Sequence, residues 1–255
     1  ESPATLCAQL AAEGFGKLAA AVGENLGTPE QKVYTGTVGQ LAASRFESLS
    51  VLLVEAAQVP SRRTQGLPDE AFARGKVPMT KQEVRAAVLA KLGVQPGELL
   101  WDVGAGTGSV SVELALAAPR GRVYAVECDP EACALIRQNK EKFAVRNLTL
   151  VEGTAPAALE NLPAPDAVFI GGTKGNMAAV VEAALARNPA ARVCISAIAL
   201  ETLSAAVAAL TAHGLQAEVC QISVSRAKAA GKLHLLMANN PIFLITRADE
   251  AEKSV

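Results

Sequence analysis

Hydrophobic and polar positions along residues 80–247 alternate between two periods, one typical of helices and one typical of short buried strands. Helical spacing predicts helices at Val110–Ala117, Pro130–Phe143, Met177–Ala186 and Leu203–Ala212. Short apolar runs predict strands at Leu99–Val103, Arg122–Val126, Leu148–Val151, Ala167–Ile170 and Val193–Ile198. Strands that alternate with helices indicate a parallel sheet with helices on both of its faces.

The two ends of this pattern differ from its middle. Thr80-Lys81-Gln82-Glu83 matches a capping box, which predicts a helix with Val84, Val88 and Leu92 on one face. At the other end, apolar runs at Gln216–Ser225 and Ile242–Thr246 are separated by too few residues for a covering helix. We expect these two strands to pair antiparallel. The fold class is therefore α/β, with a mostly parallel seven-stranded sheet and an antiparallel edge strand.

Residues 1–57 carry a smaller α/β pattern with too few apolar positions to close a core. Residues 58–66 are polar and broken by Pro and Gly, which predicts a linker, so the larger domain is expected at 67–255. The chain begins with Glu1, and we interpret this as a fragment boundary.

Composition narrows the function. A net charge of -1 argues against nucleic acid as a partner, and no apolar run approaches the length of a membrane span. The cysteines show no C-x-x-C spacing, so we expect no metal site and no disulfides, as is typical of the cytoplasm; they are Cys7, Cys128, Cys133, Cys194 and Cys220.

A glycine-rich loop is the strongest local signal. It follows a predicted strand and opens a helix, and it consists of Asp102, Val103, Gly104, Ala105, Gly106, Thr107 and Gly108. Glycines at such a turn let the backbone approach a ligand closely. The spacing G-x-G-x-G fits a class I Rossmann-like methyltransferase better than the G-x-G-x-x-G of a nicotinamide oxidoreductase. The alternative interpretation is that this glycine-rich loop is only a tight turn that binds no ligand.

Acidic and small residues extend the candidate cofactor site. Glu127 ends the second predicted strand, where a carboxylate can accept hydrogen bonds from both ribose hydroxyls, although a solvated strand end is also possible. Asp102 either contacts the cofactor or braces the loop. Thr154 and Ala155 follow the third strand, where adenine is expected to meet backbone groups. His213 and His234 are expected to be structural, and no catalytic base is evident.

Several phrases together resemble one family. They include Pro68–Phe72, Met79–Arg85, Val168–Gly172, Ala197–Thr202, Val224–Arg226 and Asn240–Phe243, in addition to the glycine loop and its continuation to Glu113. Residues 67–247 are similar to the carboxy-terminal half of the precorrin-6Y C(5,15)-methyltransferases (decarboxylating). Residues 1–57 resemble the tail of the carbon-5 methyltransferase half of the same family.

The resemblance implies a cytoplasmic, often homotetrameric enzyme that uses S-adenosylmethionine to methylate carbon 15 and that decarboxylates the carbon-12 acetate of a precorrin-6 or cobalt-precorrin-6 intermediate. By similarity, cofactor contacts come from Thr80, Gly104–Gly108, Glu127 and Ala155. The tetrapyrrole carries many carboxylates, which basic side chains can bind. The candidates are Lys81, Arg85, Lys174 and Arg226, each of which could instead be an ordinary surface charge.

Other functions stay open from the sequence. A tRNA methyltransferase shares the fold class, but it usually has a basic face and an Asn-Pro-Pro-Tyr-like motif, and neither is present. A cofactor-binding module without catalysis is the second alternative. The sequence does not determine whether the substrate holds cobalt.

Overall fold

The computed structural model describes residues 2–55, 65–231 and 233–248. The chain divides into two compact units, residues 1–62 and 63–255. Most of the predicted linker, 58–64, lies outside the described residues. None of the helices in the described part combines the length and apolar character needed to cross a bilayer.

The first unit is a small antiparallel sheet with helices. Its elements are α1 (Pro3–Leu10), a π-helical turn (Ala11–Phe15), β1 (Ala19–Glu24), β2 (Lys32–Thr37), α2 (Val38–Leu41) and β3 (Ser50–Val54), and the strand order is β2-β1-β3. Contrary to the sequence-based expectation, it has a small apolar cluster of its own. The buried members are Cys7, Ala20, Val22, Val38 and Leu41.

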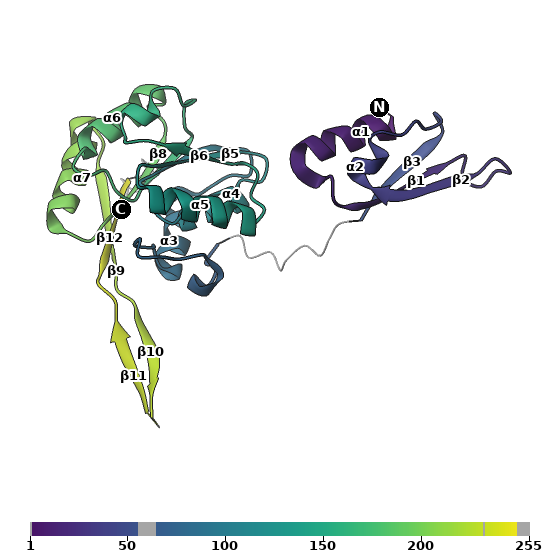
Figure 1. Ribbon diagram of the computed structural model, residues 1–255. Coiled ribbons are helices and arrows are strands. Elements are labelled where there is room, and N and C mark those ends of the chain that lie inside the picture. Colours follow the sequence, from purple (N-terminus) through teal and green to yellow (C-terminus); the bar gives the residue numbers. More distant parts are fainter. Residues whose placement is uncertain (1, 56–64, 232, 249–255) are drawn as a thin grey trace, which may run out of the picture. The chain divides into compact units, whose positions relative to one another are not determined.

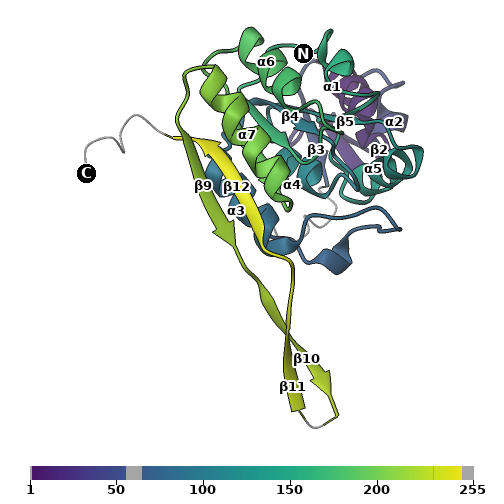
Figure 2. The same ribbon diagram turned by 90° about the vertical axis from the view of Figure 1, so that its left-hand side faces the viewer.

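The second unit is built on a seven-stranded sheet of order β6-β5-β4-β7-β8-β12-β9 (Figures 1 and 2). Its strands are β4 (Leu99–Val103), β5 (Arg122–Glu127), β6 (Leu148–Glu152), β7 (Ala167–Ile170), β8 (Arg192–Ala197), β9 (Ala217–Ile222) and β12 (Ile242–Arg247). The first five pair parallel, and β12 pairs antiparallel with both β8 and β9. The predicted antiparallel pair at the sheet edge is therefore confirmed, with β9 outermost.

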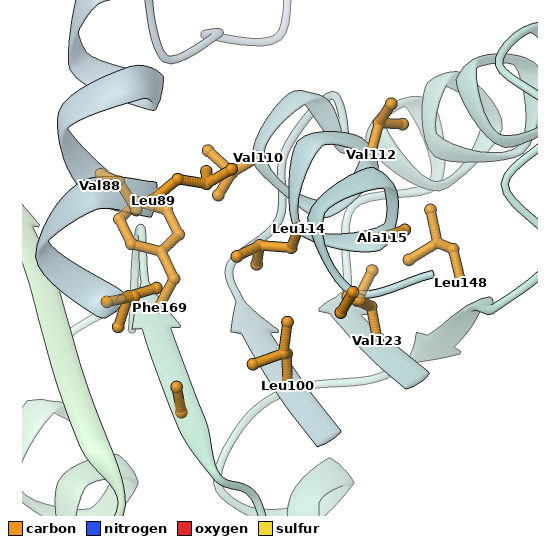
Figure 3. Packing of buried hydrophobic residues seen from close by; sticks show 14 of the residues in the cluster. Val88, Leu89, Leu100, Val110, Val112, Leu114, Ala115, Val123, Leu148 and Phe169 are labelled. Carbon is orange, nitrogen blue, oxygen red and sulfur yellow. The ribbon is translucent and has the colours of Figure 1, made fainter. Parts of the chain in front are cut away.

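Helices cover both faces of this sheet. They are α3 (Gln82–Leu92), α4 (Ser109–Ala117), α5 (Pro130–Lys142), α6 (Met177–Arg187) and α7 (Leu200–Ala212), with short 3-10 turns at Asp69–Ala71 and Ala157–Leu159. Side chains from β4, β5 and β7, among them Leu100, Val123 and Phe169, pack against α3 and α4 (Figure 3). The alternate positions of the same strands, such as Trp101 and Val168, pack against α6 and α7. Burial on both faces explains the continuous apolar strands.

The start of α3 corrects one prediction. Thr80 is not the N-cap: the helix begins at Gln82, Lys81 is the N-cap residue, and no side chain of the cap accepts a hydrogen bond. The Asp69 carboxylate instead accepts a hydrogen bond of 2.9 Å from the Gln82 backbone N–H. A residue distant in sequence therefore replaces the predicted capping box.

A long hairpin between β9 and β12 was not predicted. It consists of β10 (Ser225–Ala230) and β11 (Leu233–Ala238), which pair antiparallel and project from the rest of the second unit (Figure 2). Nearly all described hairpin side chains are exposed, including Leu233, Leu235, Leu236 and Met237.

Candidate functional site

The glycine loop joins β4 to α4 at the carboxyl edge of the sheet. Gly104, Gly106 and Gly108 all have left-handed backbone conformations, with φ of 72°, 56° and 72°. A Cβ atom on Gly104 would lie 2.4 Å from the Gly172 carbonyl oxygen, and one on Gly106 would lie 3.3 Å from the Pro78 carbonyl oxygen. The loop therefore needs glycine for its backbone conformation and for its close approach to two neighbouring segments.

Glu127 ends β5 beside this loop. Its Oε2 atom accepts a hydrogen bond of 2.8 Å from the Gly106 N–H, and its Oε1 atom accepts from the N–H groups of Cys128 and Asp129 at 2.8 and 2.9 Å. The residue is 9% exposed. A carboxylate has about four acceptor sites, and these three bonds leave one on Oε2, so Glu127 can still accept a hydrogen bond from a ligand.

A cavity of about 1040 Å³ opens along this edge. Its lining comes from the carboxyl ends of β4, β5, β6, β7 and β8, from the segment before α3, and from the base of the hairpin. This volume lies just above the usual ~300–1,000 Å³ range for small-molecule sites, which leaves room for a second ligand beside a cofactor.

Most of the predicted site residues line this cavity. They are Thr80, Lys81, Gly104, Ala105, Gly106, Thr107, Glu127, Thr154, Ala155 and Lys174. The other four, Asp102, Gly108, Arg85 and Arg226, are not part of the lining. The structure thus gathers residues that are far apart in sequence at one edge of the sheet, as expected for an open α/β fold.

Several residues of this chain fit S-adenosylmethionine. The glycine backbone offers a surface that any Cβ atom would fill, and Oε2 of Glu127 can accept a further hydrogen bond from a hydroxyl. Thr107, which lines the cavity and is 1% exposed, has a hydroxyl without a hydrogen-bond partner among the described residues. A buried polar group without a protein partner is a typical place for a ligand contact.

Comparison with known proteins identifies the family. The family described as precorrin methyltransferase domain matches residues 70–247. A relative from Pyrobaculum calidifontis is 46% identical over 186 residues, which cover 72% of this chain and 95% of that protein. The chain belongs to the precorrin methyltransferase family.

Named relatives and solved structures support the same family assignment. The Pyrobaculum protein is described as a probable cobalt-precorrin-6B C(15)-methyltransferase (decarboxylating), and a Salmonella typhimurium protein with the same activity is 40% identical over 70% of this chain and 94% of its own length. The crystal structure of a precorrin-6Y C5,15-methyltransferase from Geobacter metallireducens superposes with a TM-score of 0.70 at 40% identity, covering 74% of this chain and 98% of that one. The fold is therefore the Rossmann-like methyltransferase fold.

Asp102 is fully buried under the glycine loop of this precorrin methyltransferase. Its Oδ2 atom bonds to the Ser111 hydroxyl on α4, and its Oδ1 atom has no partner among the described residues. Burial is the largest cause that raises the pKa of Asp102 to about 7, and the nearby Glu127 charge adds to it. This position supports the reading that Asp102 braces the loop.

Gly108 also lies behind the cavity. It is the N-cap of α4, and a Cβ atom there would meet Ile136 of α5 at 2.9 Å. Gly108 therefore allows close packing of α5 rather than close approach of a ligand.

The structure contradicts the assignment of Arg85 to substrate carboxylates. Its side chain is fully buried, with Nε 2.8 Å from a Glu113 oxygen and Nη1 2.9 Å from an Asp69 oxygen. The guanidinium also bonds to the carbonyls of Thr80 and Leu67 and stacks on Phe72. Four of its five N–H donors are thus used within the chain, and complete burial keeps the side chain away from a substrate.

Arg226 is likewise engaged by the protein. It lies on β10, and its guanidinium bonds to Glu83 of α3 and to Asp69 rather than lining the cavity. Its residue type suggested a carboxylate partner, and the structure shows that this partner belongs to the same chain.

Lys174 follows β7 at the mouth of the cavity and is exposed. A hydrogen bond with the Cys128 side chain is the largest cause that raises the pKa of Lys174, and the charges of Glu127 and Asp129 contribute. Its backbone is left-handed, with φ of 50°, which is rare for a residue with a side chain. Lys174 is therefore a charged ammonium group beside Glu127.

Some lining residues were not singled out from sequence. Lys76 lies before α3, whereas Val224, Asn239 and Asn240 lie at the base of the hairpin. The phrases that contain Val224 and Asn240 contributed to the family resemblance, but nothing local indicated that they face the cavity. In the described part of the chain, no cluster of three or more His, Cys, Asp or Glu side chains is placed to hold a metal ion.

Proposed function

We propose that this chain is an S-adenosylmethionine-dependent enzyme of cobalamin biosynthesis that methylates carbon 15 and decarboxylates the carbon-12 acetate of precorrin-6 or its cobalt form. The observation that carries this proposal is the arrangement of the cavity. The glycine loop and Glu127 form one half, at the ends of β4 and β5, and the other half extends past β8 to the hairpin. The second half offers room for a large acceptor.

The cofactor half would be formed by residues named from the sequence. Glu127 would accept a hydrogen bond from a ribose hydroxyl, the backbone of Gly104–Thr107 would contact the amino-acid end, and Thr154 and Ala155 would contact adenine. S-adenosylmethionine, when bound, supplies an activated methyl group, so this chain has mainly to position the two reactants. Asp102 would keep the loop in place from below.

The acceptor half would bind a polycarboxylate ring. Lys81 and Lys174 line the cavity and can pair with ring carboxylates, whereas Arg85 and Arg226 are committed to Asp69 and its neighbours. Loss of carbon dioxide leaves an electron pair that the conjugated ring can delocalise before a proton is added. A protein base is therefore not required for this step.

Product analysis tests this function. Incubation of the chain with S-adenosylmethionine and precorrin-6Y, or the cobalt form, should give a product with one methyl group gained and carbon dioxide lost. An unchanged substrate in both cases would contradict the proposal. Two methyl groups gained would show that residues 1–57 contribute a carbon-5 activity; we propose that these residues derive from the carbon-5 methyltransferase half and are catalytically inactive here.

We also propose that the enzyme is a cytoplasmic homotetramer that assembles through its hairpin. All five cysteines are free thiols, which suits a reducing compartment. Leu235 and Leu236 are 51% and 75% exposed on a strand whose outer edge has no partner within the described chain. Unpaired edges and apolar side chains of this kind favour association with further strands.

Light scattering tests the assembly. Leu236→Lys should shift the enzyme toward smaller species, whereas Leu200→Lys, at a similarly exposed position on α7, should leave its mass unchanged. If the mass stayed unchanged in both single variants, Leu236→Lys and Leu235→Lys, the hairpin would be excluded as the interface.

A further inference from the structure

Arg226 joins three elements through hydrogen bonds. Its Nε and Nη2 atoms donate to the two carboxylate oxygens of Glu83, in the first turn of α3, at 3.1 and 2.7 Å. Its Nη1 atom donates to Oδ2 of Asp69, in the 3-10 turn before α3, at 3.0 Å. A guanidinium is suited to such a contact because its donors are fixed in one plane. The base of the hairpin is thus fastened to the segment 69–83.

Asp69 connects Arg226 to buried residues of the second unit. It is 2% exposed, and its Oδ1 atom accepts from Arg85 and from the Gln82 N–H, both at 2.9 Å. Burial raises the pKa of Asp69, but hydrogen bonds and charges of Arg85 and Arg226 outweigh this effect and hold the pKa below its usual range. Asp69 is therefore an anion held between two guanidinium groups.

The charges of the buried groups Arg85, Asp69 and Glu113 do not balance by themselves. Arg85 is in contact with two carboxylates, those of Asp69 and Glu113, and all three side chains are almost completely buried. Arg226 supplies the second positive charge from the hairpin. Since an uncompensated buried charge is costly, the interior of this unit favours the hairpin position in which Arg226 reaches Asp69.

The same residues adjoin two walls of the cavity. Thr80 lines one wall, and its carbonyl oxygen accepts from Arg85. Val224, two residues before Arg226, lines the other wall together with Asn239 and Asn240. Hydrogen bonds from Arg226 to Asp69, from Arg85 to Asp69 and from Arg85 to Thr80 therefore connect the two walls.

We propose that Arg226 is a positioning residue that fixes the distance between these walls and thereby shapes the acceptor half of the cavity. This role rests on the proposed function for the identity of the acceptor. Glu127 and the glycine loop lie at the ends of β5 and β4, whereas the wall positioned by Arg226 lies beyond β12. Loss of Arg226 should therefore affect the acceptor more than the cofactor, whose expected contacts, apart from Thr80, lie away from this wall.

Hydrogen exchange tests the positioning without any ligand. In Arg226→Met, amides in residues 76–84, 222–226 and 238–242 should exchange at least about 10-fold faster than in the parent, because the connection between the walls is lost. Residues 104–108 should keep their protection. Arg137→Met is the matched control, since it removes an exposed pair with Glu152 in which neither residue lines the cavity, and it should leave all four segments unchanged.

Ligand measurements then separate positioning from general loss of structure. Arg226→Met should bind S-adenosylhomocysteine within about twofold of the parent, while KM for the tetrapyrrole rises about 10-fold and kcat changes little. In Arg226→Lys, KM should return part of the way from the value of Arg226→Met to that of the parent. Glu83→Gln should give a KM between these two values, because the contact of Arg226 with Asp69 remains. Parental exchange rates, or a parental KM, in folded Arg226→Met would overturn the role of Arg226. A parent that binds no S-adenosylhomocysteine would instead refute the proposed function, and the exchange experiment would still decide the role of Arg226.

Discussion

The backbone N–H of Gly106 donates a hydrogen bond of 2.8 Å to the Glu127 carboxylate, which ties the glycine loop to the end of the neighbouring strand. The same carboxylate is held by the N–H groups of Cys128 and Asp129. Its orientation is therefore fixed before any ligand binds. This arrangement lowers the entropic cost of using Glu127 as a hydrogen-bond acceptor for a cofactor.

Glu127→Gln should weaken binding of S-adenosylhomocysteine by about 1.5 to 3 kcal/mol, the range for hydrogen bonds to a charged group. Isothermal titration calorimetry measures this change. Glu152→Gln is the matched control, since Glu152 is the register neighbour of Glu127 on β6 but does not line the cavity. If Glu127→Gln bound as tightly as the parent, Glu127 would not be a ribose ligand.

Gly106→Arg should abolish cofactor binding and lower the melting temperature by only a few degrees, because a left-handed φ costs a side chain about 1–2 kcal/mol. The new side chain would start beside Val77 and Pro78, which line the same cavity, and would fill space that the cofactor is expected to use. Gly97→Arg is the control: Gly97 precedes β4, and a Cβ atom there meets nothing within 4 Å. Unchanged affinity in Gly106→Arg would contradict the assignment of the loop.

Arg85→Met should destabilise the fold by about 3–5 kcal/mol, because it leaves the buried carboxylates of Asp69 and Glu113 without their shared counterion. Arg137→Met, at an exposed pair, should cost less than about 1 kcal/mol. Urea unfolding of both variants gives the comparison. Similar losses in the two variants would show that the buried pairs contribute no more than surface ones.

The carboxyl group of Asp102 should make stability depend on pH in an unusual direction. Its pKa is about 7 in the fold because of burial, against an ordinary value of 3.8, so the folded state binds more protons between these pH values. The free energy of unfolding should therefore fall as pH rises from about 4 to 7, by roughly 4 kcal/mol at most from this group. Asp102→Asn should remove this part of the slope. An identical slope in parent and variant would exclude a protonated Asp102.

The central strands and helices could be predicted because their patterns are local. Leu99–Val103 and Ala167–Ile170 are apolar runs between turn residues, and both are strands with these bounds. The hairpin β10–β11 could not be predicted in this way, since its apolar side chains are exposed and give no burial pattern. The insertion of β12 between β8 and β9 depends on long-range pairing that no local pattern records.

The residues of the candidate site divide in the same way, into those that a local motif predicts and those that only the folded chain reveals. Gly104, Gly106 and Glu127 lie in short motifs whose spacing reflects the geometry of a strand end, and the structure brings them together. Arg85 was misassigned because residue type does not reveal burial: its carboxylate partners are 16 and 28 residues away in the sequence. Only the folded chain shows which basic side chains are already neutralised.

The position of β12 in the sheet also limits the order in which parts of the domain can fold during synthesis. β9 pairs with β12 and not with β8, so it has no partner in the sheet until residues 242–247 have been synthesised. Ile222 and Val224 can therefore join the cavity lining only after nearly the whole domain has been translated. A nascent chain can complete the half with the glycine loop first, which makes the acceptor half the last part of this enzyme to form on the ribosome.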